Sequence, residues 1–294
     1  MRFSRCLLLV GFTAAVAAAQ PLATPLWLRG YSVIPAPQRV TLGAGDVIFD
    51  GDWRAEPGAV PATHIAVRTL RNDLKAFHGV ELKPASSRVI RLSLQPGVAA
   101  IADREVQAQG YRLAIAPGSI EIAGNSDAGL LYGVHTLIQL LRRDARGVLL
   151  MPEAVIEDWP RLPLRFLHWD SKHHQDRMET LKRYLDWSAR MKINMIGFEL
   201  EDKFAYPSNP IIGAPGAFTA AELQEIVNYG LERFIQVVPV IQAPAHLCFV
   251  LKHPQFAHLR ADGNNYQACL CDEESYKLIF RMYDDVIAAA KGVD

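Results

Sequence analysis

Hydrophobic and polar positions alternate over several short runs in the first half of the chain, a pattern typical of half-buried β-strands. These runs occupy residues 39–49, 89–94, 111–115 and 120–122. The last two flank Pro117 and Gly118, so we expect them to form a hairpin.

Two stretches of the same half carry apolar residues at helical spacing, residues 62–78 and 128–142. Gly79 ends the first predicted helix, and the candidates for the cap of the second are Asn125, Ser126 and Asp127. Strands and helices in this order favour a small α+β domain in which helices pack on one side of a sheet.

After a proline-containing joint at residues 156–163, the rhythm changes to alternating strands and helices. Strands are predicted at 164–169, 194–200 and 234–241, and helices at 178–191, from Thr219 onward, and at 272–291. The first strand is a nearly continuous apolar run, so we expect it to be buried on both faces. Thr219 and Glu222 form a capping box.

Alternating strands and helices imply parallel pairing, and the favoured architecture is a (β/α) TIM-type barrel with its chemistry at the carboxyl ends of the strands. A complete barrel has eight units in about 250 residues, whereas the residues after the joint suffice for about three. We therefore expect an α+β domain at residues 30–158, followed by an incomplete (β/α) barrel at 160–294.

The first residues predict export. Arg2 and Arg5 precede an apolar stretch at 6–16, and small residues at 17–19 resemble a cleavage site, so residues 1–19 are interpreted as a signal peptide. The stretch is too short for a membrane span. We expect a periplasmic or extracellular protein without a membrane segment after cleavage.

Charge and cysteine content narrow the function. The 31 basic and 31 acidic side chains balance, which removes the electrostatic case for nucleic acid. Cys248, Cys269 and Cys271 remain after signal cleavage, and their odd number and close spacing argue against a full set of disulfides or a zinc site. We interpret them as buried free thiols.

Polar residues gather where the predicted barrel strands end. They are His168, Asp170, His173 and His174 after the first strand, Glu199, Glu201 and Asp202 after the second, and Gln242 and His246 after the third. Each alone is explained equally well as a helix cap, a loop residue or a surface charge. Their coincidence at three strand ends favours a binding site. No metal-ligand spacing, phosphate-binding glycine loop or nucleophile elbow accompanies them.

Arg165 stands at the start of an otherwise apolar strand. An arginine that points into a barrel needs acceptors, and either the hydroxyls of a sugar or the carboxylate of a structural ion pair can supply them.

Several segments together resemble glycoside hydrolase family 20. PRLPLRFLHWD at 160–170 resembles the opening of that family's catalytic barrel, followed by METLKRYLD at 178–186 and MKINM at 191–195. Residues 218–229 resemble the second barrel helix, and VVPVIQAPAH at 237–246 resembles the third strand and its loop. The upstream region, with GLLYG at 129–133, resembles the non-catalytic domain that commonly precedes the barrel.

The resemblance implies a β-N-acetylhexosaminidase that removes terminal β-linked N-acetylglucosamine or N-acetylgalactosamine from glycans or chitooligosaccharides. It implies a retaining, substrate-assisted mechanism in which the acetamido oxygen attacks the anomeric carbon, without a metal or organic cofactor. The positions that match substrate-binding residues are Arg165, Asp170, His174, Asp202 and His246. Four positions depart from the common pattern: Glu199 replaces a frequent histidine, Val240 and Gln242 replace Glu and Asp, and Ala245 replaces a glycine.

The family's catalytic Asp-Glu pair is expected beyond Asp294. Asp272 and Glu273 are interpreted instead as the acidic start of a helix. We therefore expect the chain by itself to be an inactive, truncated hydrolase. The alternatives are a non-catalytic carbohydrate-binding or structural fragment, and another barrel glycosidase that shares the same type of preceding domain.

Overall fold

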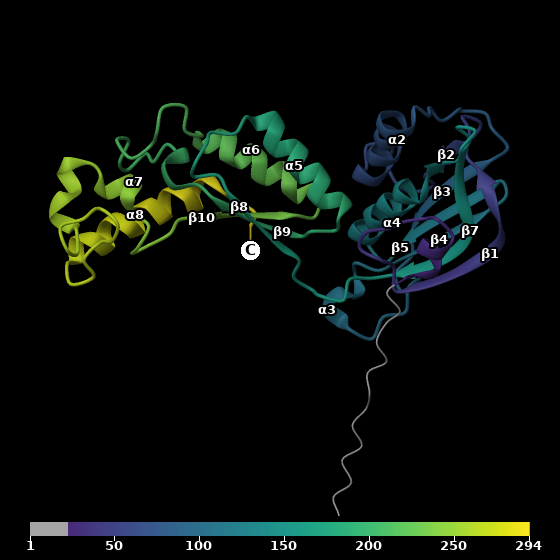
Figure 1. Cartoon of the computed structure of the whole chain (residues 1–294), viewed down its shortest axis with the longest axis horizontal. Helices are drawn as coiled ribbons and strands as arrows, with labels where there is room; N and C mark the ends of the chain where they lie inside the picture. The colour runs from purple at the N-terminus through teal and green to yellow at the C-terminus, as the bar shows by residue number, and fades with distance from the viewer. Residues whose placement is uncertain (1–22, 294) are drawn as a thin grey trace, which may run out of the picture.

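A computed structural model describes residues 23–293, which form two lobes arranged along the long axis of the molecule (Figure 1). The signal-peptide prediction falls outside the described residues. The N-terminal lobe contains α1 (Pro25–Leu28), β1 (Arg39–Ile48), β2 (Arg54–Glu56), α2 (Ile65–His78), β3 (Val89–Leu94), α3 (Arg104–Gln107), β4 (Tyr111–Ala116), β5 (Ser119–Gly124), α4 (Asp127–Leu140), β6 (Arg142–Arg143) and β7 (Leu149–Asp158). The sheet order is β1-β7-β4-β5-β3-β2, with β6 paired to β7.

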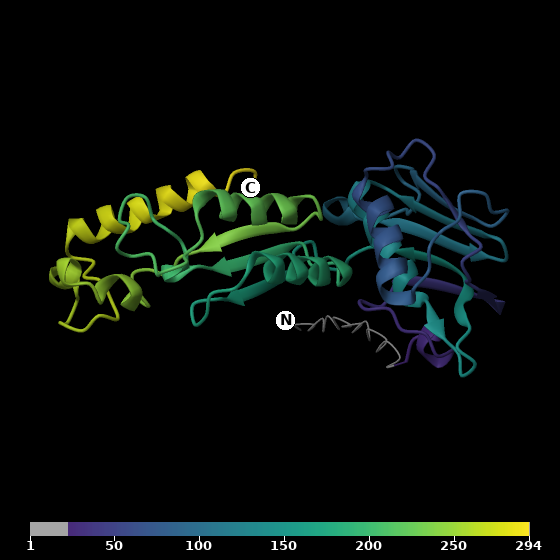
Figure 2. The same ribbon diagram turned by 90° about the horizontal axis from the view of Figure 1, so that it is seen from above.

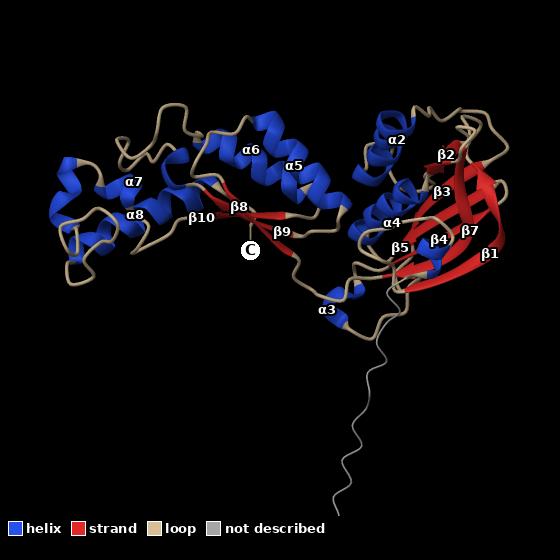
Figure 3. Ribbon diagram, viewed as in Figure 1, coloured by secondary structure: helices blue, strands red, loops and turns tan. Residues whose placement is uncertain are grey.

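The sheet of this lobe carries α2 and α4 on the side that faces the other lobe (Figures 1 and 3). Both helices and the β4–β5 hairpin lie where the sequence predicts them, and Gly79 ends α2 in the left-handed conformation with φ of 68°. A Cβ atom on Gly129 of α4 would lie 2.1 Å from the carbonyl oxygen of Gly110, so only glycine allows this close approach to the sheet. Ser126 is the residue at the N-cap of α4, although its side chain makes no capping hydrogen bond.

Strand β7 was not predicted as a strand. Its last residues were interpreted as part of an extended joint, yet it pairs with β1 on one side and β4 on the other. Pro152 obscured the pattern, because proline cannot donate to a ladder and argues against a central strand. In the structure Pro152 lies opposite Asp46, next to the point where β1 shifts register. The N–H group that proline lacks is therefore absent where the ladder between β1 and β7 is already interrupted.

The C-terminal lobe consists of strand–helix units, as the sequence predicts. It contains β8 (Phe166–Asp170), α5 (Met178–Arg190), β9 (Met195–Glu199), a 3₁₀ turn (Glu201–Lys203), α6 (Ala220–Leu231), β10 (Gln236–Val240), α7 (Cys248–Leu251), a second 3₁₀ segment (Pro254–Leu259) and α8 (Glu273–Ala289). The three strands pair in parallel in the order β10-β9-β8. An α+β lobe followed by TIM-barrel-like units is therefore confirmed as the coarse architecture.

Helices α5 and α6 cover one face of the three-stranded sheet, and α8 packs beside α6 (Figure 2). Ile196, Phe198 and Val237 point toward these helices and are buried. The capping box of Thr219 and Glu222 forms at the start of α6 as predicted. Asp272 caps α8 by accepting a hydrogen bond from the backbone N–H of Glu274.

Two burial predictions are wrong. Strand β8 is not buried on both faces: Phe166 is 52% exposed on the face that α5 and α6 leave uncovered, and Leu167 is 38% exposed at the edge of the sheet. The thiols are free but not buried, since Cys248 and Cys271 are exposed and Cys269 is half-buried. They lie at the start of α7 and in the segment before α8, where the chain runs over the surface.

None of the helices formed by residues 23–293 is long and apolar enough to cross a membrane.

A buried cluster of polar side chains joins the two lobes. Lys192, which follows α5, donates from Nζ to Asp158 Oδ2 at 2.7 Å and to the Tyr111 hydroxyl at 3.1 Å. Tyr111 also donates to Asp158 Oδ2 at 2.8 Å, and the backbone N–H of Gln38 donates to Oδ1 at 3.1 Å. Burial lowers the pKa of the Lys192 amine, while the Asp158 carboxylate opposes that shift. Removing either side chain would therefore leave the other charge buried without a partner, which is strongly destabilising.

We predict that Lys192→Met destabilises the protein by about 3–5 kcal/mol, because it leaves the Asp158 carboxylate buried without its cation. Residue 192 has φ of 58°, and methionine bears the same backbone strain as lysine, so the difference reports the lost charge. The measurement is urea unfolding followed by tryptophan fluorescence.

The matched control is Lys182→Met, which removes a half-exposed amine of α5 that bonds the exposed Glu225 of α6 at the surface. An exposed pair is worth about 0–1 kcal/mol, so this variant should unfold close to the unsubstituted protein. Equal unfolding midpoints for the two variants would contradict the role assigned to Lys192.

Candidate functional site

The ends of the three parallel strands place two carboxylates opposite each other on adjacent strands. Asp170 of β8 lies opposite Glu199 of β9, and Glu199 lies opposite Val240 of β10. Because side chains alternate along a strand, Phe166, His168 and Asp170 share the face that α5 and α6 do not cover. Asp170 at the end of β8, Glu199 at the end of β9, and Lys172 and Gln242 on the segments that follow β8 and β10 form a group that we call the polar edge.

Glu199 is the centre of this edge. Its side chain is fully buried, and its Oε1 atom accepts from Gln242 Nε2 at 2.6 Å and from Lys172 Nζ at 3.1 Å. The Oε2 atom lies 2.8 Å from His168 Nε2 without forming a hydrogen bond to it. A buried carboxylate needs such partners, because its desolvation is costly.

Lys172, which is not among the predicted site residues, links two of the strand ends. Its Nζ atom donates to Asp170 Oδ2 at 2.6 Å as well as to Glu199. The hydrogen bond from Lys172 lowers the pKa of Asp170, and the bond to Asp170 raises the pKa of Lys172. The available signal was its position two residues after Asp170, on the loop that leaves a barrel strand.

Glu201 and Asp202 follow β9 in the 3₁₀ turn and differ in their electrostatics. Burial, and then the neighbouring Glu199 carboxylate, raise the pKa of Glu201 to about 7. Burial also acts to raise the pKa of Asp202, but hydrogen bonds from Lys203 at 2.6 Å and Lys252 at 3.3 Å hold it below its usual value. Glu201 also has φ of 42°, a strained conformation for a residue other than glycine.

The two histidines predicted as site residues make contacts outside the central cluster. His174 is exposed, and its Nε2 atom lies 3.1 Å from Asp176 Oδ2 within the same loop. His246 is exposed with φ of 58°, and its Nε2 atom shares a hydrogen bond of 2.8 Å with the Tyr266 hydroxyl. The strand ends thus bring together Asp170 and Glu199, with Glu201 and Asp202 in the turn after β9.

Arg165 was expected to point into the barrel, but its side chain turns toward the N-terminal lobe. Its five N–H groups all have acceptors: the carbonyl oxygens of Lys192, Leu162 and Pro163, Gln109 Oε1, and the Tyr132 hydroxyl. The guanidinium also lies over the Tyr132 ring at 5.8 Å from its centroid. Because Tyr132 and Gln109 belong to the N-terminal lobe, Arg165 joins the lobes and has no free donor for a sugar in this conformation.

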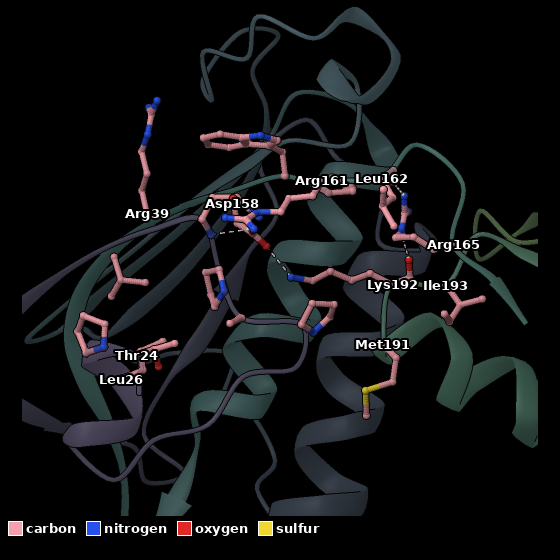
Figure 4. Close-up of a pocket in the computed structure, with 18 of the residues that line it drawn as sticks. Thr24, Leu26, Arg39, Asp158, Arg161, Leu162, Arg165, Met191, Lys192 and Ile193 are labelled. Carbon is pink, nitrogen blue, oxygen red and sulfur yellow. Dashed lines mark hydrogen bonds and ion pairs between the residues drawn. The ribbon is translucent and has the colours of Figure 1, made fainter. Parts of the chain in front are cut away.

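A hollow of about 960 Å³ lies near Arg165, lined by residues such as Thr24, Asp158, Met191 and Ile193 (Figure 4). Arg165 precedes β8 and Ile193 precedes β9, so this hollow lies at the amino ends of the strands. Barrel enzymes carry their chemistry at the opposite ends, and the polar edge around Glu199 is therefore the better candidate site.

The chemistry available at the polar edge is hydrogen bonding and proton exchange. No group of three or more His, Cys, Asp or Glu side chains within residues 23–293 has a geometry that could hold a metal ion. Asp170, Lys172 and Gln242 provide acceptors and donors that suit the hydroxyl groups of a sugar. Glu201, with a pKa of about 7, can both bind and release a proton near neutral pH.

Comparison with known proteins gives the same family for both lobes. Residues 30–159 match the family model for glycosyl hydrolase family 20, domain 2, and residues 163–292 match the model for the catalytic domain of that family. A β-hexosaminidase of Porphyromonas gingivalis is 26% identical over 99% of this chain and 39% of its own length. A β-N-acetylhexosaminidase of Cellulomonas fimi is 32% identical over 47% of this chain and 31% of its own length.

The fold comparison agrees. The solved structure of Streptomyces plicatus N-acetyl-β-hexosaminidase in complex with thio-NAglucal superposes with a TM-score of 0.74 and 27% identity, covering 92% of this chain and 59% of that one. The chain spans about two fifths or less of the length of the two curated relatives described above.

We predict that Glu201→Gln raises the melting temperature at about pH 8.5 more than at about pH 5. With a folded pKa of about 7 against 4.5 for an ordinary glutamate, the folded chain retains a proton that the unfolded chain has lost between these values. The resulting stabilisation is complete below pH 4.5 and is lost as the pH rises through 7. Glutamine cannot ionise, so the variant avoids that loss.

Melting curves at the two pH values test this expectation, with Glu179→Gln on the exposed surface of α5 as the control. The control should change the melting temperature by the same amount at both pH values. If the effect of Glu201→Gln on the melting temperature were the same at both pH values, the pKa of this carboxyl would not be raised in the folded protein.

Proposed function

Since the chain belongs to glycoside hydrolase family 20, we propose that it carries the amino-sugar site of an exported β-N-acetylhexosaminidase. The substrate is a glycan or chitooligosaccharide with a terminal β-linked N-acetylglucosamine or N-acetylgalactosamine. The observation that carries the proposal is the polar edge at the carboxyl ends of β8, β9 and β10, where Asp170, Lys172 and Gln242 surround the buried Glu199.

In this proposal the chain's own residues bind and orient the sugar. Asp170 remains ionised, because Lys172 lowers its pKa, and so it can accept hydrogen bonds from two neighbouring hydroxyls. Asp202 is held ionised in the same way by Lys203 and Lys252. Charged acceptors fixed by a second group lose little freedom when the sugar arrives, which favours tight binding.

The bond-breaking step of this family uses an Asp-Glu pair together with the acetamido oxygen of the substrate. Asp272 and Glu273 do not supply that pair, because they begin α8 rather than end a strand. We therefore propose that these 294 residues by themselves bind the amino sugar without hydrolysing it. Arg165 is left out of the binding residues, since its donors are engaged between the lobes.

We predict that the protein binds N-acetylglucosamine saturably and that Asp170→Asn weakens this binding about tenfold. Loss of a charged hydrogen-bond partner costs about 1.5–3 kcal/mol, which corresponds to tenfold or more in affinity. Isothermal titration calorimetry measures the binding. Asp284→Asn, which removes an exposed carboxylate of α8, is the matched control and should bind as the unsubstituted protein does.

Release of nitrophenol from p-nitrophenyl N-acetyl-β-glucosaminide is measured beside the calorimetry. Binding without release is the expected result. Release by this chain would place the catalytic acid among Glu199, Glu201, Asp202 and Glu273, and would overturn the part of the proposal that concerns hydrolysis. An absence of saturable binding would overturn the assignment of the site itself.

A further inference from the structure

A second polar cavity, of about 140 Å³, lies between helices of the two lobes and away from the strand ends. Helices α2 and α4 provide one wall, with Arg68, Asp73 and His135. The other wall comes from α5 and the end of α6, with Asp186, Arg190 and Arg233. The residues of the polar edge around Glu199 do not line it, so it is a separate feature.

Three arginines and two aspartates line this cavity, and Glu232, which lies outside the lining, pairs with Arg68 and Arg233. Both aspartates are already engaged: Asp73 accepts from Arg190 at 2.8 and 3.0 Å, and Asp186 accepts from Arg233 at 2.7 Å and from the Tyr229 hydroxyl. The third arginine, Arg68, forms an ion pair with Glu232 through one terminal nitrogen. Donors are therefore in excess over acceptors.

Two buried polar groups of the lining are left without a partner in the described part of the chain. Neither ring nitrogen of His135 makes a hydrogen bond, although only 3% of this residue is exposed. The Nε–H of Arg68 is buried and unpaired as well. Each unsatisfied buried group costs about 1–3 kcal/mol, so native proteins retain such groups where a ligand or water completes them.

The surroundings of His135 keep its imidazole neutral. Burial lowers the pKa of His135 to about 3, and the positive charges of Arg190, Lys192 and Arg233 act in the same direction. The imidazole is therefore neutral, and one of its ring nitrogens is a donor that a bound anion can accept from. The volume is well below the roughly 300–1,000 Å³ that is usual for organic ligands, which excludes a hexosamine residue.

We propose that this cavity is a binding site for a small tetrahedral oxyanion, inorganic phosphate or sulfate, that bridges the two lobes. The anion would accept from the Arg68 Nε–H, from His135 and from the unused donors of Arg190 and Arg233. Arginine suits this role, because its planar fork matches the geometry of an oxyanion. Asn72 is exposed at the margin of the cavity, which provides a route of entry from solvent.

Calorimetric titration of the whole protein with sodium phosphate, and separately with sodium sulfate, tests the site. Sodium chloride keeps the ionic strength constant. We expect one saturable site and a melting temperature that rises with anion concentration, by an amount that depends on the affinity.

Arg68→Lys should weaken binding about tenfold, because lysine retains the charge but lacks the Nε–H and the planar fork. Arg71→Lys, on the exposed side of the same helix, should leave the affinity unchanged.

Crystals of the unsubstituted protein soaked in selenate provide a second measurement that needs no variant. An anomalous peak between Arg68, His135 and Arg233 supports the proposal. Binding of phosphate alone, or of sulfate alone, supports it and identifies the preferred anion. The absence of saturable heat and of a peak would mean that the cavity holds only water, and equal affinities of the Arg68→Lys and Arg71→Lys proteins would place the anion elsewhere. Either result overturns the proposal.

Discussion

The buried ion pair between Lys192 and Asp158 is the constraint on which the arrangement of the two lobes depends. Asp158 ends the last strand of the N-terminal sheet, and Lys192 leaves the first helix of the barrel-like lobe, so their contact fixes where the second lobe begins. Arg165 strengthens the same joint, since its five donors are divided between both lobes. A pair this deeply buried contributes orientation more than net stability, because desolvation offsets much of its attraction.

This joint determines what the strands can present at their other ends. Strand β8 starts directly after Arg165, and β9 starts shortly after Lys192, so two adjacent strands begin at the anchored joint. A parallel sheet with fixed starts and equal strand lengths brings its carboxyl ends into register. Asp170 and Glu199 therefore lie opposite each other, and Lys172 can bond both. Local rigidity of this kind is what a binding site requires of its scaffold.

The sequence predicted most elements, because their signals are local. The capping box of Thr219 and Glu222 and the terminating Gly79 each act within one helical turn. It failed where the outcome depends on long-range partners. The direction of Arg165 depends on Gln109 and Tyr132, which are distant in sequence, and the partial exposure of β8 depends on its edge position. Of the site, the cluster at strand ends could be predicted from the barrel rule. The position of Lys172 after Asp170 was a local signal, but its bond to Glu199 depends on a partner 27 residues away along the chain.

The unusual residues of the site are physically coupled. In the family that the chain resembles, a histidine is frequent at position 199 and an aspartate at 242, whereas this chain has a glutamate and a glutamine. The structure shows that these two side chains bond each other, with the Gln242 amide donating to Glu199 Oε1 at 2.6 Å. The carboxylate thus lies on β9 and its donor on the segment after β10. Lys172 supplies the positive charge that a buried glutamate needs and that a histidine would not need. A substitution of Lys172 or Gln242 alone would therefore leave the buried Glu199 carboxylate without one of its partners.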